Sequence, residues 1–224
     1  MTGPNKVVRL IVASNETRAG TAAASEGSVR GDARALLEGL REGERAAARQ
    51  FVEEYRAHVE RVLTRILGWH SELDDLTQDV FARAFARVTE VREADALRGW
   101  LTAIAVFVAR EAIRRKRRHR WLLFRPSQDT PEMPCAPASL EARAALRAFY
   151  EVVNEMDVDA RIAFTLRCVD GMELTEVADA CDVSLATIKR RLKVALDDFY
   201  RRGQSRAELV DWFEEGSRWR QTES

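Results

Sequence analysis

"ELDDLTQDVFARAF", residues 72–85, has the pattern of an amphipathic helix with one acidic side. Apolar residues such as Leu76 and Val80 recur every three or four positions, which places them on one helical face. Asp75 and Asp79 are one turn apart and lie on a different face from these apolar residues. The pattern therefore predicts a helix that buries one side in a core and exposes carboxylates on the other.

Helical periodicity continues on both sides of this segment, from Ala33 to about Phe124 and again over residues 139–200. No run of alternating apolar and polar residues is long enough to form a sheet, so the sequence predicts an all-α fold. The clearest series of apolar residues at helical spacing is Phe51, Tyr55, Val59, Val62 and Ile66.

The segment "RPSQDTPEMPCAPAS", residues 125–139, contains four of the five prolines in the chain. Proline lacks a backbone donor and disfavours helix in the residue before it, so this segment is expected to be a linker between two small helical domains. The expected organisation is a flexible N-terminal extension (1–31), a first helical domain (32–124), the linker (125–139), a second helical domain (140–202) and a C-terminal tail (203–224).

Charge is unevenly distributed along the 224 residues, although 36 Lys and Arg balance 36 Asp and Glu. Residues 1–125 carry a net charge of +6 and residues 126–224 a net charge of −6. The segment 101–125 alone contains eight basic residues and a single acid, Glu111. Such a concentration of positive charge predicts a polyanionic partner.

The three cysteines show no C-x-x-C pair and no histidine at ligand spacing, so neither a zinc site nor a disulfide framework is expected. We expect reduced cysteines and no cofactor. The N-terminal apolar run, residues 7–13, is far shorter than the ~20 residues that span a membrane. A cytoplasmic protein without membrane insertion is therefore predicted.

The segment "LTEVADACDVSLATIKRRL", residues 174–192, has the pattern of a helix-turn-helix motif. Asp182 occupies the expected turn, and Ser184 is placed to cap the second helix. Leu185, Ile188 and Leu192 are expected to face inward. Residues expected to face outward, as in a recognition helix in the major groove, are Ala186, Thr187, Lys189, Arg190 and Lys193.

These segments together resemble the extracytoplasmic-function group of bacterial sigma factors. Residues 72–85 are similar to the D-x-x-D-L-x-Q-E-V-F signature of sigma region 2, and "LRGWLTAIAVFVAREAIRRKRR", residues 97–118, is similar to the helices that follow it. Residues 156–196 resemble sigma region 4. The resemblance implies a non-enzymatic protein that binds core RNA polymerase and promoter DNA, with an anti-sigma factor as a candidate third partner.

The resemblance also implies a role for each group of candidate residues. Core RNA polymerase would contact Asp74, Asp75, Gln78 and Asp79. The −10 region of the promoter would contact Phe107, Arg110, Arg114, Arg115, Arg117 and Arg118, with base reading near residues 89–97. The −35 region would contact Ser184, Ala186, Thr187, Lys189, Arg190, Arg191 and Lys193.

Two local questions have more than one answer at this stage. Family members often carry asparagine at the position of Phe107, which could stack on a base or, as we favour from its spacing to Trp100 and Ile104, lie in the core. The C-terminal tail could cover a binding face, but we favour its packing on the second domain.

Two other functions are compatible with parts of the sequence. A stand-alone helix-turn-helix regulator would explain residues 174–192 but not the acidic helix that precedes the basic one. A nuclease that holds a metal with the carboxylates of residues 72–79 would need further ligands, and no such set is visible. The sigma-factor interpretation is therefore preferred.

Overall fold

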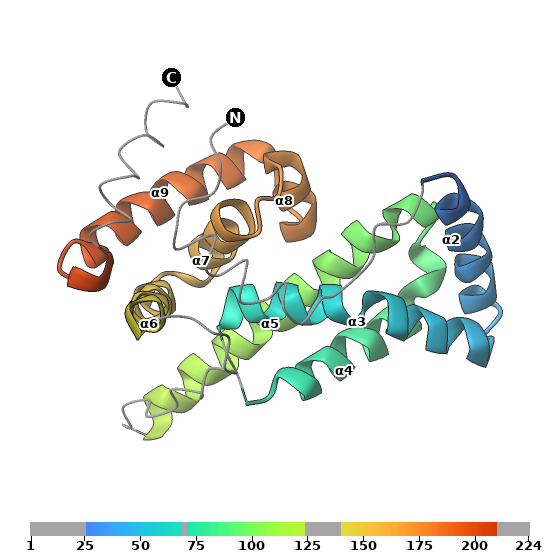
Figure 1. The fold of residues 1–224 in the computed structure, drawn as a ribbon, viewed down its shortest axis with the longest axis horizontal. Helices are drawn as coiled ribbons and strands as arrows, with labels where there is room; N and C mark the ends of the chain where they lie inside the picture. Colours follow the sequence, from blue (N-terminus) through green and yellow to red (C-terminus); the bar gives the residue numbers. More distant parts are fainter. Residues whose placement is uncertain (1–25, 69–70, 124–139, 210–224) are drawn as a thin grey trace.

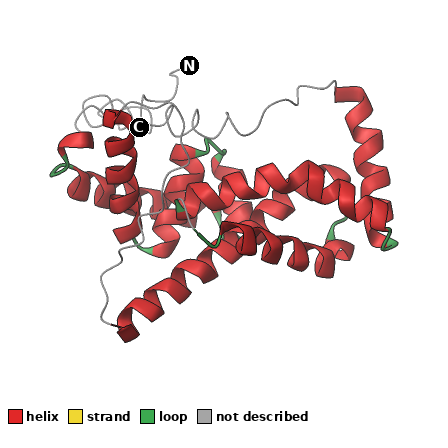
Figure 2. Cartoon of the chain, turned by 60° about the horizontal axis from the view of Figure 1, so that its bottom comes forward, coloured by secondary structure: helices red, strands yellow, loops and turns green. Residues whose placement is uncertain are grey.

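The computed structural model describes residues 26–68, 71–123 and 140–209, and all regular structure in these ranges is helical. The predicted all-α fold is thus confirmed (Figures 1 and 2). The expected linker and most of the C-terminal tail lie outside the described residues. The N-terminal half contains α2 (Glu26–Arg41), α3 (Arg45–Leu67), α4 (Leu73–Arg87), the 3-10 turns η1 (Val88–Glu90) and η2 (Ala94–Ala96), and α5 (Leu97–Leu123).

The first helix begins at Glu26, inside the stretch expected to be an extension. The C-terminal half contains α6 (Leu140–Glu155), α7 (Val158–Phe164), a five-residue π-helical turn η3 (Thr165–Val169), α8 (Leu174–Cys181), α9 (Leu185–Gly203) and the 3-10 turn η4 (Ala207–Leu209).

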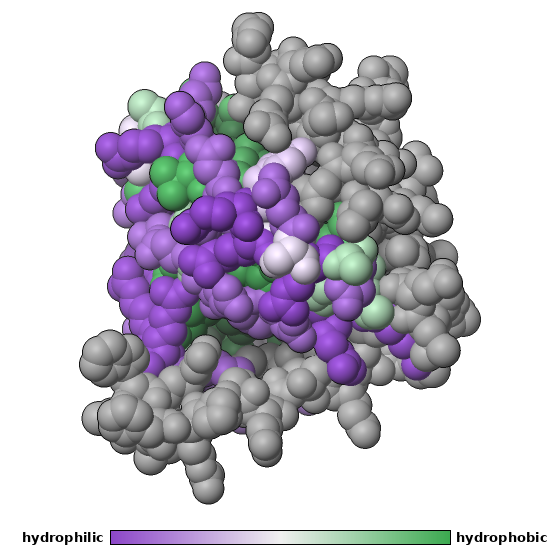
Figure 3. Space-filling view, turned by 90° about the vertical axis from the view of Figure 1, so that its left-hand side faces the viewer, coloured by the Kyte–Doolittle hydropathy of each residue, from purple (hydrophilic) through white to green (hydrophobic). Residues whose placement is uncertain are grey.

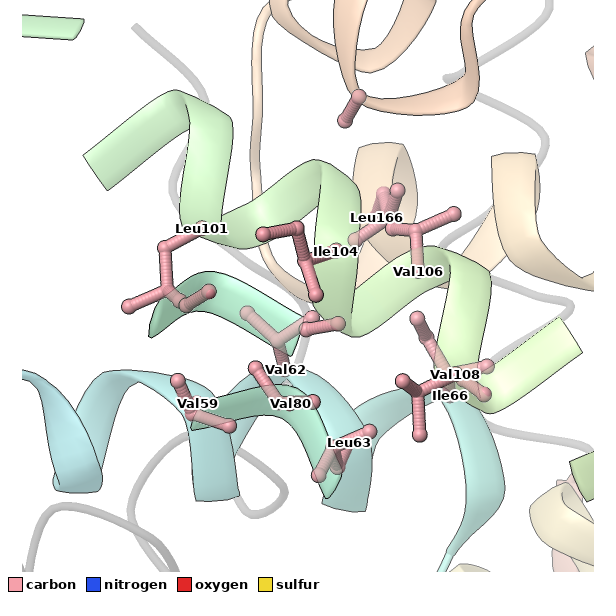
Figure 4. Close-up of a cluster of buried hydrophobic side chains, with 14 of the residues drawn as sticks. Val59, Val62, Leu63, Ile66, Val80, Leu101, Ile104, Val106, Val108 and Leu166 are labelled. Carbon is pink, nitrogen blue, oxygen red and sulfur yellow. The ribbon is translucent and has the colours of Figure 1, made fainter. Parts of the chain in front are cut away.

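Helix α5 is the longest helix described, with 27 residues, and it runs diagonally through the N-terminal half in Figure 1. A helix of this length extends about 40 Å. Its apolar side faces α3 and α4. The apolar residues that the sequence predicts on one face of α3 pack against this side. Figure 4 shows Val62 and Ile66 of α3, Val80 of α4 and Leu101 of α5 in one buried cluster.

The C-terminal half has its own core of three aromatic rings. Phe149 of α6, Phe164 of α7 and Phe199 of α9 are all fully buried. The Phe164 and Phe199 rings are stacked with their centroids 5.0 Å apart, and Phe149 lies 5.6 Å from Phe199. Leu209 joins this cluster, so the first part of the tail packs on the C-terminal half as expected.

The two halves are in direct contact in the described structure. Helix α7 has two apolar sides: Phe164 belongs to the aromatic core, whereas Ile162 belongs to the cluster of the N-terminal half. Leu166 of η3 also lies in the cluster of the N-terminal half, near Val106 of α5 (Figure 4). The end of the molecule that holds α6 and the C-terminal part of α9 presents mainly hydrophilic side chains (Figure 3).

Replacing Phe164 by alanine should lower the free energy of unfolding by about 3–5 kcal/mol, because it leaves a cavity between two buried rings. The same replacement at Phe85, which is 39 % exposed, provides the matched control and should cost far less. Urea unfolding followed by circular dichroism measures both. Equal losses in the two variants would contradict the aromatic core.

Candidate functional site

Helix α4 presents its polar side to solvent. Asp74, Asp75 and Gln78 are exposed, whereas Leu76 and Val80 on the other side are buried. Within the described residues, neither Asp75 nor Gln78 has a hydrogen-bond or ion-pair partner. The helix therefore leaves these polar groups available for an external partner.

The other two carboxylates of this surface have intramolecular partners. Asp79 is half-buried, and its Oδ1 lies 3.0 Å from Arg83 Nε. Asp74 Oδ1 accepts a hydrogen bond of 3.0 Å from Arg56 Nη2. Exposed pairs of this kind contribute little to stability, typically less than ~1 kcal/mol, so a partner with stronger positive charge can replace them.

One face of α5 carries Phe107, Arg114 and Arg118, which are all exposed. The expectation that Phe107 lies in the core is wrong, because 44 % of it is exposed. The neighbouring positions Val106 and Val108 are buried instead, so Phe107 falls outside the apolar stripe of α5. The guanidinium carbon of Arg83 lies 5.1 Å from the Phe107 ring centroid, which is a cation–π distance.

Other basic residues of α5 have partners within the chain. Arg115 is exposed, but its Nη2 lies 2.7 Å from Glu72 Oε2. Arg117 donates to the carbonyl of Met156, the residue that follows α6. Arg110 lies 3.1 Å from Asp159 Oδ1 of α7. The basic segment is thus divided between a solvent-exposed face and a face that contacts the C-terminal half.

The turn of the helix-turn-helix motif agrees with the sequence prediction. Asp182 adopts a left-handed conformation, with φ 54° and ψ 52°. An aspartate tolerates this conformation better than most residues. The Ser184 hydroxyl caps α9 by accepting a hydrogen bond of 3.2 Å from the backbone N–H of Thr187.

Helix α9 exposes most of its predicted DNA-contacting residues. Ile188 and Leu192 are buried as expected, but Leu185 is 38 % exposed, so its predicted inward orientation is wrong. Leu185 is the first residue of α9 and lies at the N-terminus of this helix. Arg191 is half-buried and lies 3.3 Å from Asp159. Thr187 is also half-buried, and the exposed members of the set are Ser184, Ala186, Lys189, Arg190 and Lys193.

A cavity of about 1620 Å³ lies between the halves, and sequence analysis gave no sign of it. Inside it, the Thr102 hydroxyl donates to the Arg98 carbonyl (2.8 Å), so it accepts from His58 Nε2 (2.8 Å). His58 Nδ1 then accepts from Arg61 Nη2 at 2.9 Å. Burial, with the charges of Arg98 and Arg61, lowers the pKa of His58 from 6.5 to about 3. The imidazole is therefore neutral at pH 7.

The two halves match two parts of one protein family. Residues 51–119 match the family model Sigma-70 region 2, and residues 146–198 match Sigma-70, region 4. Together these matches cover more than half of the chain. The ECF RNA polymerase sigma-E factor of Haemophilus influenzae is 24 % identical over 172 residues, which is 70 % of this chain and 88 % of that protein. The chain belongs to the extracytoplasmic-function (ECF) group of the sigma-70 family.

Further comparisons find a second similar sequence and two solved structures with a similar fold. The ECF sigma-E factor of Escherichia coli K12 is 24 % identical over 171 residues, covering 70 % of this chain and 86 % of that protein. CnrH, solved in complex with the cytosolic domain of CnrY, has a TM-score of 0.56 at 19 % identity, covering 78 % of this sigma factor and 98 % of CnrH. RpoE of Bartonella quintana, solved with the anti-sigma factor NepR, has a TM-score of 0.56 at 20 % identity, covering 70 % and 97 %.

The family assignment gives this protein the role of an RNA polymerase sigma factor. Region 2 (residues 51–119) contains α4 and most of α5, and region 4 (residues 146–198) contains α7, α8 and most of α9. Among the helices described, none is both long and apolar enough to cross a membrane.

His58 should make this sigma factor less stable in mild acid. Below pH 6.5 the unfolded chain binds a proton at His58 that the folded chain does not bind, so stability is complete above pH 6.5 and falls towards pH 3. Relative to a His58→Gln variant, the parent should lose about 2 kcal/mol of unfolding free energy between pH 7 and pH 5. Urea unfolding at the two pH values measures the difference, and equal losses would contradict a neutral, buried His58.

Proposed function

We propose that this sigma factor binds core RNA polymerase through the acidic surface of α4, the promoter −10 region through the exposed face of α5, and the −35 region through α9. The observation that carries the proposal is the segregation of charge on the exposed surfaces. The outer side of α4 presents Asp74 and Asp75, whereas the outer side of α9 presents Lys189 and Arg190. Complementary charge gives each surface a different partner and fixes the orientation of the complex.

The proposed polymerase surface consists of Asp74, Asp75, Gln78 and Asp79. Its location on a helix rather than on a loop supports this role, since the buried residues Leu76 and Val80 hold the helix in place. Two of the four residues have no partner inside the described chain, and the other two form only exposed or half-exposed pairs. Docking on a basic polymerase surface would therefore disrupt little internal structure.

The proposed −10 surface consists of Phe107, Arg114 and Arg118, with Arg115 next to them. The arginines would neutralise phosphates, and the exposed Phe107 ring would stack on an unpaired base. Arg83 lies over the same ring, so a base would compete with an existing cation–π contact or join it on the free side.

A stand-alone helix-turn-helix regulator is less consistent with the comparisons, because the region 2 match includes the acidic helix. An anti-sigma factor is a further proposed partner. Of the two solved structures named above, RpoE of Bartonella quintana has such a protein bound, and CnrH has the cytosolic domain of CnrY bound.

Replacing both Asp75 and Asp79 by lysine should weaken binding to core RNA polymerase by at least about 30-fold, since a mispaired interfacial charge costs ~2 kcal/mol or more. Replacing Glu42 and Glu44, two exposed carboxylates before α3, by lysine is the matched control and should leave binding unchanged. A pull-down with purified core enzyme measures the affinities. The proposed surface would be disproved by equal binding of both double variants and the parent.

Replacing Lys189 and Arg190 by alanine should reduce discrimination among −35 sequences by about 1–3 kcal/mol if either side chain contacts a base edge. Run-off transcription from promoters that differ only in the −35 element measures this discrimination.

Replacing Arg114 and Arg118 by glutamine gives the comparison for phosphate contacts. That variant should keep its −35 discrimination. The slope of the logarithm of promoter affinity against the logarithm of salt concentration should become less steep by up to ~1.8. Uniform weakening at all −35 sequences in the Lys189 and Arg190 variant would assign those two residues to phosphates alone.

A further inference from the structure

Glu111 is the single acid in segment 101–125 of the chain, which contains eight basic residues. It follows Phe107 by four positions and precedes Arg114 by three, so it lies on the same exposed face of α5 as these two residues. A carboxylate in this position repels the phosphates that the neighbouring arginines would attract. Its presence on a proposed DNA-binding face therefore requires a role other than binding to the DNA backbone.

The structure gives Glu111 a partner on the neighbouring helix. Glu111 Oε2 lies 2.8 Å from Arg83 Nη2 of α4. Arg83 Nε donates to Asp79 Oδ1 at 3.0 Å. The two carboxylates, one from α4 and one from α5, contact different nitrogens of one planar guanidinium group. They therefore fix the orientation of this group as well as its position.

The guanidinium group held in this way lies over the Phe107 ring, with its carbon 5.1 Å from the ring centroid. The positive charge is attracted to the electron-rich face of the ring. The contact also restricts the rotamer of Phe107, which an exposed side chain on a helix could otherwise change. With Arg83 in place, Phe107 is still 44 % exposed, so part of the ring remains open to solvent.

An unpaired base can approach this ring from two sides. On the side of Arg83 the base would displace the guanidinium group, which breaks the cation–π contact and both contacts with carboxylates. On the other side the base stacks on the ring and breaks none of these contacts. The second approach is therefore favoured, and it places base, ring and guanidinium group in one stack.

The two carboxylates that hold Arg83 differ in their position relative to the polymerase. Asp79 belongs to the proposed polymerase surface, where cations of the polymerase would compete with Arg83 for its carboxylate. Glu111 lies on α5, outside that surface, and would still hold Arg83. In the complex with polymerase, the position of Arg83 over the ring would thus depend mainly on Glu111.

We propose that Arg83 and Glu111 are positioning residues for the −10 strand. Glu111 holds the Arg83 guanidinium group on one side of the Phe107 ring, and one unpaired base of the strand stacks on the other side. Neither Arg83 nor Glu111 contacts the base itself. This arrangement rests on the proposed function, in which Phe107 stacks on an unpaired base.

Promoter DNA that lacks a single base measures the stacking directly. The probe is a forked promoter fragment with an unpaired −10 strand, bound to holoenzyme assembled from purified core polymerase and the full chain. The affinity for this fragment, divided by the affinity for the same fragment with one abasic sugar, reports the base alone, because both fragments carry the same phosphates. An abasic sugar is placed at each position of the strand in turn. At the stacked position the ratio should be about ten in the parent, and Phe107→Ala should lower it.

At that position Arg83→Gln should lower the ratio by roughly two- to fivefold, the range of an exposed cation–π contact. Glu111→Gln should lower it too, although the loss of an acid ordinarily strengthens binding to DNA. The matched control is Arg87→Gln, which removes an arginine of the same helix that pairs with Glu90. This control should leave the ratio unchanged. Helix content measured by circular dichroism shows whether each variant is folded.

A folded Arg83→Gln or Glu111→Gln variant with the same ratio as Arg87→Gln overturns the positioning role of that residue. The double variant with Phe107→Ala and Arg83→Gln should have the same ratio as Phe107→Ala alone. A further decrease would mean that Arg83 contacts the base directly, which also overturns its positioning role. If Phe107→Ala leaves the ratio unchanged at every position, the proposed stacking fails and the positioning role fails with it. If Phe107→Ala alone lowers the ratio, only the positioning role fails.

Discussion

The helical periodicity of α5 is the constraint on which the rest of this structure depends. With 3.6 residues per turn, Val106, Arg110 and Arg117 share one side of the helix, and Phe107, Arg114 and Arg118 share another. The first side contacts region 4, and the second faces solvent. The basic segment of α5 thus has two roles. The position of each arginine around the helix axis decides whether that arginine contacts region 4 or faces solvent.

Local patterns in the sequence were sufficient to predict most of the helices and the helix-turn-helix motif, although the start of α2 at Glu26 was missed. Apolar spacing identified Val59, Val62 and Ile66 as buried, and residue chemistry identified Asp182 as the turn and Ser184 as the cap. These features depend on neighbours within one or two turns, which a single sequence displays directly.

Contacts between distant segments could not be predicted in the same way. Nothing in the sequence pairs Arg65 with Asp170 or Arg110 with Asp159, because burial decides which charges meet and burial requires the packed fold. Phe107 was misjudged for a related reason: its spacing to Trp100 and Ile104 is helical, but Ile104 is buried whereas Phe107, one turn further along α5, is 44 % exposed. Spacing identifies which residues share a face, not how far the neighbouring helices extend over it.

Helix α7 has apolar residues on two sides, and this has a consequence for the life of the protein in a cell. If region 4 separated from region 2 without a polymerase to bind, Ile162, Leu166 and Val177 would be left in water on one face. Exposed apolar patches of this kind promote aggregation and recognition by chaperones and proteases. A chain whose region 4 is not packed on region 2 or on another protein would therefore be prone to aggregation and proteolysis.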